Sequence, residues 1–180
     1  MRVVLDTCVL YPTVMREVLL GVAARGGFEP LWSPRILEEW ARAAVKLGPA
    51  GEAQARGEIA LLRSDWPAAE RAVPEGLAAR LWLPDADDVH VLALAVDASA
   101  DAVMTLNARD FPRGVLAEEG LSRVDPDGFL MTLFPLMEND IRDAAETVLA
   151  TAQSMTSKDW SMRALMKKAR LPRLGKALSS

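Results

Sequence analysis

A short apolar segment that ends directly in an acid, Val3-Val4-Leu5-Asp6, constrains this chain most. Its β-branched residues and its unbroken apolar run predict a short buried strand. An ionised aspartate at the end of such a strand costs free energy unless it is paired or binds a cation. Asp6 is therefore either a cap of the next helix or part of a functional site.

Strand-like and helix-like segments alternate after this first strand. Strands are predicted at 31–32, 102–105 and 122–124. Helices are predicted at 12–25, 34–47, 52–63, 89–96, from 126 onward, at 138–152 and at 157–170. This alternation predicts a three-layer α/β/α fold with a central, mostly parallel sheet. Ligands of such sheets lie beyond the carboxyl ends of the strands, which places Asp6 and the segment after Thr105 at the functional edge.

Composition excludes several classes of protein. The chain has 180 residues, of which 51% are apolar and 26% charged, so it can fill one core and is not generally disordered. No apolar run reaches the ~20 residues that span a bilayer, and Met1-Arg2 leads directly into the first strand, without a signal peptide. Cys8 is the only cysteine, so we expect neither disulfides nor a cysteine-based zinc site. These features favour a reducing cytoplasm and no membrane partner.

The charge of the chain is divided unevenly. Residues 157–180 carry a formal charge of +6, and the rest of the chain carries −10. An acidic body suits cations, and a basic tail suits phosphate or an acidic partner, although basic tails are also common solvated ends. Candidate RNA-binding residues in this tail are Lys167, Lys168, Arg170 and Arg173.

Helical phase selects one acid in the segment 34–47. Its apolar stripe consists of Ile36, Trp40, Ala43 and Leu47. Glu39 lies on the flank of that stripe, whereas Glu38 points toward solvent. Glu39 is thus the candidate for an inward carboxylate, and the alternative is that both are surface residues.

Two further acidic segments adjoin predicted strands or helices. Asp85, Asp87 and Asp88 precede an apolar helix, where acids also serve as caps and complement the helix dipole. Three acids in four residues exceed that need, and Asp88 is the candidate for the site. Asn107 and Asp110 follow the strand that ends at Thr105, although Asn-x-x-Asp is also a common turn signal.

Taken together, Asp6, Glu39, Asp88 and Asp110 come from separate elements and offer only oxygen ligands. Such ligands favour one or two Mg²⁺ or Mn²⁺ ions, and paired ions of this kind support phosphodiester cleavage. An aspartyl-phosphate mechanism needs a second acid two residues after the first, where this chain has Cys8. The sequence also lacks a P-loop and a dinucleotide-binding glycine motif.

Other reactive or aromatic residues are interpreted as structural. His90 is the only histidine, and a lone histidine is more often packed than catalytic. Nothing near Cys8 predicts a lowered pKa for its thiol, so we expect a small core residue. Four tryptophans (Trp32, Trp40, Trp66 and Trp82) are expected mostly in the core. Trp160, in the basic tail, is expected to pack on the body rather than stack on a base.

Four segments in order resemble the motifs of PIN-domain proteins, in particular the VapC-type toxins of bacterial toxin–antitoxin systems. They are Val-Val-Leu-Asp-Thr-Cys-Val-Leu, Ser-Pro-Arg-Ile-Leu-Glu-Glu-Trp, Pro-Asp-Ala-Asp-Asp-Val-His-Val-Leu-Ala-Leu-Ala and Val-Met-Thr-Leu-Asn-Ala-Arg-Asp-Phe-Pro. The resemblance covers residues 1–130 and implies a PIN-like nuclease domain there. Residues 131–180 are then a C-terminal helical extension with the basic tail.

This resemblance implies a Mg²⁺- or Mn²⁺-dependent endoribonuclease that acts on RNA such as tRNA. It places the family's acidic ligands at Asp6, Glu39, Asp88 and Asp110, supported by Thr7, Thr105 and Asn107. It also implies a cognate antitoxin that covers the acidic pocket with a basic side chain, and a homodimer. Two alternatives stay open. The first is a nuclease that acts on DNA or on a particular nucleic-acid structure, and the second is a non-catalytic interaction module.

Overall fold

The computed structural model of the chain describes residues 1–156 and 158–179, which form two compact units. The first unit comprises residues 1–11 and 29–124, and the second comprises residues 12–28 and 125–180. The helix at residues 13–24 thus belongs with the C-terminal helices, which the sequence did not suggest. The division into domains at residue 130 stays a prediction.

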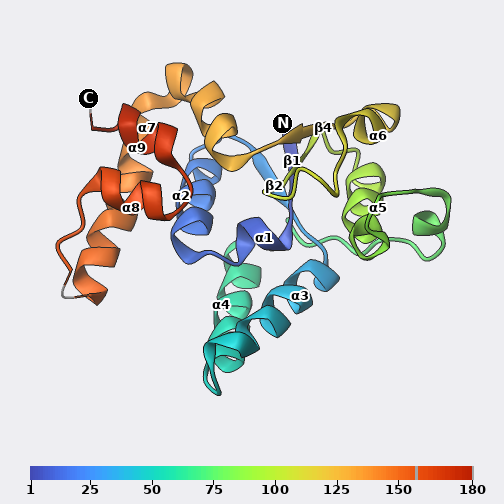
Figure 1. Cartoon of the computed structure of the whole chain (residues 1–180), viewed down its shortest axis with the longest axis horizontal. Helices are drawn as coiled ribbons and strands as arrows, with labels where there is room; N and C mark the ends of the chain where they lie inside the picture. Colours follow the sequence, from blue (N-terminus) through green and yellow to red (C-terminus); the bar gives the residue numbers. More distant parts are fainter. Residues whose placement is uncertain (157, 180) are drawn as a thin grey trace. The chain divides into compact units, whose positions relative to one another are not determined.

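The first unit contains the sheet and the helices between its strands (Figure 1). Its elements are β1 (Arg2–Leu5), α1 (Thr7–Leu10), β2 (Glu29–Leu31), α3 (Pro34–Ala44), η1 (Val45–Leu47), α4 (Gly51–Asp65), η2 (Leu77–Arg80), η3 (Ala86–Asp88), α5 (Val89–Asp97), β3 (Ala102–Met104), α6 (Arg113–Glu118) and β4 (Ser122–Val124), where η marks a 3-10 helix. The second unit contains α2 (Thr13–Ala24), α7 (Pro126–Met155), α8 (Met162–Lys168) and α9 (Pro172–Ala177).

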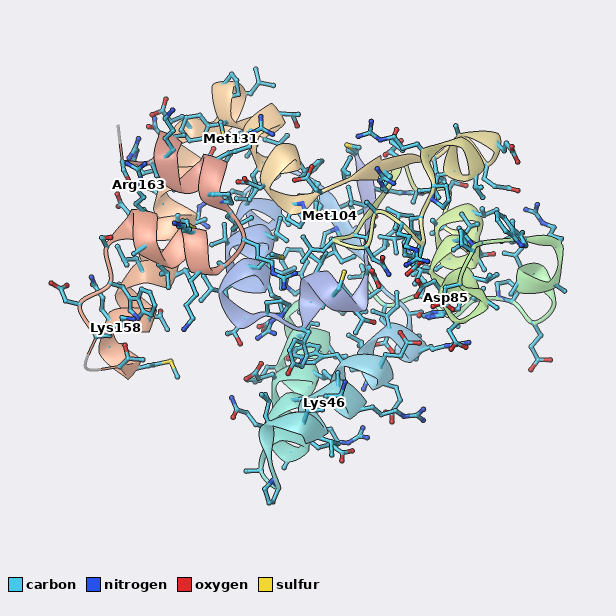
Figure 2. All side chains as sticks on the ribbon, in the orientation of Figure 1. Lys46, Asp85, Met104, Met131, Lys158 and Arg163 are labelled. Carbon is cyan, nitrogen blue, oxygen red and sulfur yellow. The ribbon has the colours of Figure 1, made fainter. Side chains whose placement is uncertain are left out.

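One parallel sheet organises the first unit. In the described part of the chain it has four strands in the order β2-β1-β3-β4, with every neighbouring pair parallel. The expected α/β fold with a parallel sheet is confirmed. Leu5 lies opposite Met104, which is fully buried and labelled in Figure 2. The residues that follow these two, Asp6 and Thr105, therefore leave the sheet side by side.

Local sequence signals account for helix α3, which follows β2. The Ser33 side chain accepts a hydrogen bond from the backbone N–H of Ile36, and Pro34 occupies the first turn of α3. Ile36 and Trp40 are buried, as their phase predicts. Gly48 then adopts a positive φ of 104°, which a residue without Cβ tolerates best, and the chain turns into α4.

Several short helices were not predicted from the sequence: α1, α6 and α9 have too few residues for a periodic pattern. The predicted helices from Pro126 and from Glu138 form one long helix, α7, with a kink at Met137. Pro135 explains the kink, because proline lacks an N–H and clashes with the preceding turn. The final predicted helix begins later than expected, at Met162, and its cap is Ser161. Ser157, the expected cap, lies outside the described residues.

The prediction that Trp82 belongs to the core is wrong. Its side chain is 64% exposed, whereas the next residue, Leu83, is 2% exposed. Backbone in an extended conformation alternates its side chains between two faces, so burying Leu83 turns Trp82 toward solvent. Trp32 and Trp40 are buried as expected.

The second unit is entirely helical in its described residues. Gly21 lets α2 approach α7 closely, because a Cβ at this position would lie 3.0 Å from the Cβ of Ala144. At the other end of α7, the buried Asp127 carboxylate accepts hydrogen bonds from the backbone N–H groups of Arg173 and Leu174, at 2.9 and 3.0 Å. A side chain of α7 therefore caps α9. Within the residues that the structure describes, no helix is both long and apolar enough to cross a membrane.

Candidate metal centre

Asp6 and Thr105 begin the candidate site at the carboxyl ends of β1 and β3. The Asp6 side chain is 6% exposed, and its Oδ2 accepts a 2.7 Å hydrogen bond from Oγ1 of Thr105. Its backbone N–H still bonds to the carbonyl of Met104, which continues the β1–β3 ladder by one residue. Asp6 caps α1 through its backbone carbonyl and not through its side chain. The carboxylate is thus free for the site, and the capping alternative for this side chain is wrong.

Cys8 supplies a second donor to the same carboxylate oxygen. Its Sγ lies 3.0 Å from Oδ2 of Asp6 and accepts a hydrogen bond from the backbone N–H of Leu106. Burial and then the negative charge of Asp6 raise the pKa of the Cys8 thiol to about 12. The thiol therefore stays protonated and serves as a hydrogen-bond donor rather than a nucleophile.

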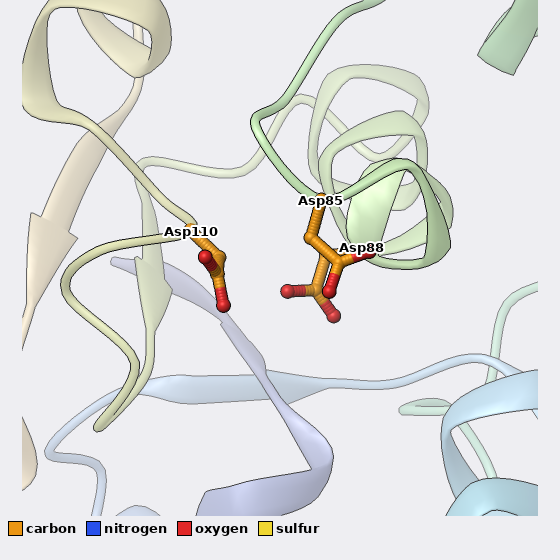
Figure 3. Close-up of side chains that lie close together, drawn as sticks. All are labelled: Asp85, Asp88 and Asp110. Carbon is orange, nitrogen blue, oxygen red and sulfur yellow. The ribbon is translucent and has the colours of Figure 1, made fainter.

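Three carboxylates gather beside this strand end. Asp85, Asp88 and Asp110 each offer an oxygen, and these oxygens all lie within 4.8 Å of one another. Figure 3 shows Asp110 reaching in from the loop after β3, with Asp85 and Asp88 coming from the turn before α5. Asn107 holds Asp110 by a hydrogen bond from its side-chain amide. Asp85 also accepts a hydrogen bond from the backbone N–H of Asp87, so it caps this turn as expected and faces the other acids as well.

Burial and the neighbouring acids both raise the pKa of Asp88. Burial raises the pKa of Asp88 to about 6, and the negative charges of Asp6, Asp85 and Asp110 contribute in the same direction. Like charges that face one another without a cation have this effect. The charge of Asp6 contributes to the pKa of Asp88, so the strand-end acid lies close enough to Asp88 to influence it.

Glu39 lies in a different setting, against basic and hydroxyl groups. Its Oε2 accepts a 3.0 Å hydrogen bond from Thr7, and its Oε1 accepts one of 3.1 Å from Arg35. Nε2 of the buried His90 lies 2.9 Å from Oε1, without the alignment of a hydrogen bond. Burial opposes the ionisation of Glu39, but the close His90 contact, Thr7 and Arg35 together outweigh it and lower its pKa. Glu39 is therefore held as a carboxylate.

The structure brings together only part of the four acids predicted for the metal site. Asp88 and Asp110 share the acidic group, whereas no set of three that includes Asp6 or Glu39 meets the same separation among the described residues. Thr7, which follows Asp6 in the chain, connects Glu39 to the strand end. Asp85 was not selected from the sequence, although the surplus of acids over capping needs was the signal for it. The roles of all these residues as metal ligands stay predictions.

The donor set fits a hard divalent cation. Its ligand atoms are carboxylate oxygens, which Mg²⁺ and Mn²⁺ prefer. A cation among them would offset the repulsion that, after burial, contributes to the raised pKa of Asp88. The residues present therefore suit the cofactor that the motifs imply, and they give no preference between the two ions.

Comparison with known proteins identifies a protein family that covers most of the site. A protein-family model described as the PIN domain matches residues 2–109, which is more than half of the chain. This range includes β1, the acidic turn before α5 and the loop that carries Asn107. No curated protein and no solved structure matches the chain.

Proposed function

Because the chain belongs to the PIN-domain family, whose members are typically metal-dependent nucleases, we propose that it is a Mg²⁺- or Mn²⁺-dependent endoribonuclease. The observation that carries this proposal is the group of Asp85, Asp88 and Asp110 beside Asp6. A cluster of acids that repel one another in the absence of a cation suits a site that operates with the cation bound.

We assign the cation to Asp85, Asp88 and Asp110, with Asp6 held beside them by Thr105 and Cys8. When bound, the cation supplies Lewis-acid chemistry, by lowering the pKa of water and offsetting charge that develops on a phosphate. A cation beside Asp88 would favour its ionised form, because it offsets the negative charges of Asp6, Asp85 and Asp110, which add to burial in raising the pKa of Asp88. Glu39 stays ionised beside His90, where it can orient a water molecule or accept a proton.

The preference for RNA rests on the resemblance of the four ordered motifs to VapC-type toxins. On the same basis we propose that the protein is the toxin of a type II toxin–antitoxin pair. It would then work in the cytoplasm as a homodimer, and its cognate antitoxin would place a basic side chain among the acids. Structured RNA such as tRNA is the expected substrate.

The test of the nuclease activity is Asp6→Asn, compared with Asp87→Asn. Asparagine keeps the shape of the buried Asp6 side chain, and Asp87 is an exposed acid next to the site but outside the acidic group. We expect Asp6→Asn to abolish cleavage of RNA in Mg²⁺ or Mn²⁺ while the protein stays folded, and Asp87→Asn to cleave normally. Normal cleavage by Asp6→Asn would show that the site assignment is wrong.

Substrate and partner are tested separately. Equal amounts of single-stranded RNA, tRNA and DNA are incubated with the protein and Mn²⁺, and we expect cleavage of RNA alone. Preferential cleavage of DNA would favour the alternative nuclease class, and failure to bind Mn²⁺ in a calorimetric titration would favour a non-catalytic module. Expression of the wild type in bacteria should arrest growth, and the product of a small neighbouring reading frame should relieve the arrest.

A further inference from the structure

The basic side chains of the C-terminal segment are exposed without exception in its described residues. They are Lys158, Arg163, Lys167, Lys168, Arg170, Arg173 and Lys176. The acid in this segment is Asp159. Figure 2 labels Lys158 and Arg163 at two points of the segment. This concentration of one sign of charge contrasts with the acidic remainder of the chain.

Ion pairing differs between these residues and many of the arginines in the rest of the described chain. Several arginines elsewhere pair with glutamates, as in the pairs Arg2–Glu29, Arg35–Glu39, Arg42–Glu38, Arg56–Glu52, Arg63–Glu70, Arg80–Glu119 and Arg142–Glu138. In contrast, no ion pair joins Arg163, Lys167, Lys168, Arg170 or Arg173 to an acid in the part of the chain that the structure describes. We call these five residues the C-terminal basic surface. Their charges are available to an external anion.

The backbone beneath this surface is fixed. Buried leucines hold α8 and α9 to the second unit, and Gly175 allows close packing, because a Cβ there would lie 2.8 Å from the Cβ of Met166. Asp127 caps α9 at the N–H groups of Arg173 and Leu174. A fixed array of cations binds an extended anion with a smaller loss of conformational entropy than a disordered tail.

Arg170 occupies a backbone conformation that arginine rarely adopts. Its φ is +61°, and it follows Ala169, the C-cap of α8, at a position where glycine is favoured. At positive φ, the backbone of any residue with a Cβ is strained. An exposed arginine kept at such a position suggests that its side chain has a use that offsets the strain.

Trp160 adds an aromatic surface beside the cations. Nζ of Lys158 lies 4.2 Å from its ring centroid, and Nζ of Lys168 lies 5.0 Å from it. Trp160 is partly exposed. Aromatic rings next to cations are common in surfaces that bind nucleic-acid strands.

We propose that the C-terminal basic surface binds the phosphate backbone of RNA. The choice of RNA over another polyanion rests on the proposed function, which makes RNA the substrate. A lipid surface fits less well, because membrane-binding helices need a free apolar face. Here Leu165, Met166, Leu171 and Leu174 are buried in the second unit.

The experiment measures the affinity of the full chain for a labelled single-stranded RNA by fluorescence anisotropy, in EDTA to prevent cleavage. Salt is varied from about 50 mM to about 400 mM, since each phosphate contact contributes about 0.7 to the slope of log affinity against log salt. The surface variant is Lys167→Gln, Lys168→Gln, Arg170→Gly and Arg173→Gln combined. We expect its slope to be smaller than that of the wild type by about 3.

A control variant separates local charge from net charge. It combines Arg42→Gln, Arg56→Gln, Arg63→Gln and Arg80→Gln, which change the net charge equally at arginines that pair with glutamates. We expect it to retain the wild-type slope. Arg170→Gly alone should lower the slope by about 0.7 while its melting temperature stays equal to or above that of the wild type, because glycine relieves the strain.

Each outcome decides the proposal. The proposal is supported if the salt slope of the surface variant is smaller than that of the wild type and the control variant keeps the wild-type slope. It is overturned if the surface variant and the control variant have the same slope, whether or not that slope differs from the wild type. Displacement of RNA by polyglutamate at equal charge concentration would also overturn it, in favour of an acidic polypeptide partner. Cleavage of RNA by the wild type in Mn²⁺ is measured in parallel, so that binding without cleavage counts against the nuclease function and not against this surface.

Discussion

Thr105 donates a hydrogen bond of 2.7 Å to Asp6, a residue that lies 99 positions earlier in the chain. The register of β1 and β3 creates this pair, because Leu5 lies opposite Met104 and the next residues leave the sheet together. The hydroxyl of Thr105 also accepts a hydrogen bond from the backbone N–H of Asn107. One side chain thus connects the strand-end acid with the loop that carries Asp110.

Replacing Thr105 tests this connection. Thr105→Val keeps the volume but removes a donor to a buried carboxylate, and we expect it to lower the free energy of unfolding by about 1.5–3 kcal/mol. Thr105→Ser keeps the hydroxyl and loses one methyl group, which should cost about 1 kcal/mol. Urea unfolding in EDTA measures both values. Equal losses for the two variants would show that the hydrogen bond contributes little.

Asp88 makes the metal-free protein sensitive to pH. Its pKa is raised from an ordinary value of 3.8 to about 6, first by burial and then by Asp6, Asp85 and Asp110. The folded state therefore holds this proton more tightly than the unfolded state, so the contribution of Asp88 to stability falls as pH rises from about 4 to about 6. Asp88→Asn lacks this titration. Above pH ~6 and in EDTA we expect the variant to unfold at a higher urea concentration than the wild type, with the difference shrinking toward pH ~4.

Added Mn²⁺ should favour the wild type over Asp88→Asn in resistance to urea. A bound cation would stabilise the folded wild type in proportion to its occupancy of the site, and Asp88→Asn would remove one of the proposed charged ligands. At pH ~7 we expect Mn²⁺ to raise the unfolding midpoint of the wild type more than that of the variant. A variant that responds to Mn²⁺ as the wild type does would remove Asp88 from the cation site.

Cys8 should resist alkylation in the folded protein. Its thiol has a pKa of about 12, so almost none of it is thiolate at pH ~8. We expect iodoacetamide to modify Cys8 slowly in buffer and rapidly in concentrated urea, as measured by the mass of the adduct. Asp6→Asn should speed the reaction of the folded protein, because Asp6 contributes a negative charge and accepts a hydrogen bond from the thiol. Rapid labelling of the folded wild type would contradict this environment.

Asp127 should stabilise the C-terminal helices. Asp127→Ala leaves two buried or partly buried backbone donors without an acceptor, which should lower the free energy of unfolding by about 1–3 kcal/mol. Asp143 is an exposed acid on the same helix, and Asp143→Ala should change stability by less than about 0.5 kcal/mol. Hydrogen exchange at the amides of Arg173 and Leu174 locates the effect. Unchanged exchange at these amides in Asp127→Ala would show that the cap is not required.

Much of the fold follows from the sequence because its signals are local. The β-branched run before Asp6, the Ser33-Pro34 cap and the apolar periodicity after Asp88 each predict an element that the structure contains. Strand alternation with helices also predicts the parallel sheet, because parallel strands need long crossovers. The positions of Asp6 and Thr105 at one edge follow from that topology.

The composition of the acidic group depends on tertiary geometry and could not be predicted fully. Asp85 has the sequence signature of a cap, and it does cap its turn, yet its carboxylate also faces Asp88 and Asp110. Glu39 was selected by helical phase, but its distance from the other acids is set by how α3 packs. His90 beside Glu39 has no sequence signal, since a lone histidine is usually a packed residue.

The pairing of α2 with α7 has a consequence for synthesis on the ribosome. Residues 13–24 emerge about a hundred residues before the helix that begins at Pro126. At about 5–20 residues per second, α2 waits for roughly 5–20 seconds before its partner is available. During that interval the nascent helix, whose buried residues include Met15, Val18 and Leu19, lacks the α7 that packs beside Gly21. Chaperone binding to this early segment is therefore expected, and a chain that terminates before Pro126 should aggregate.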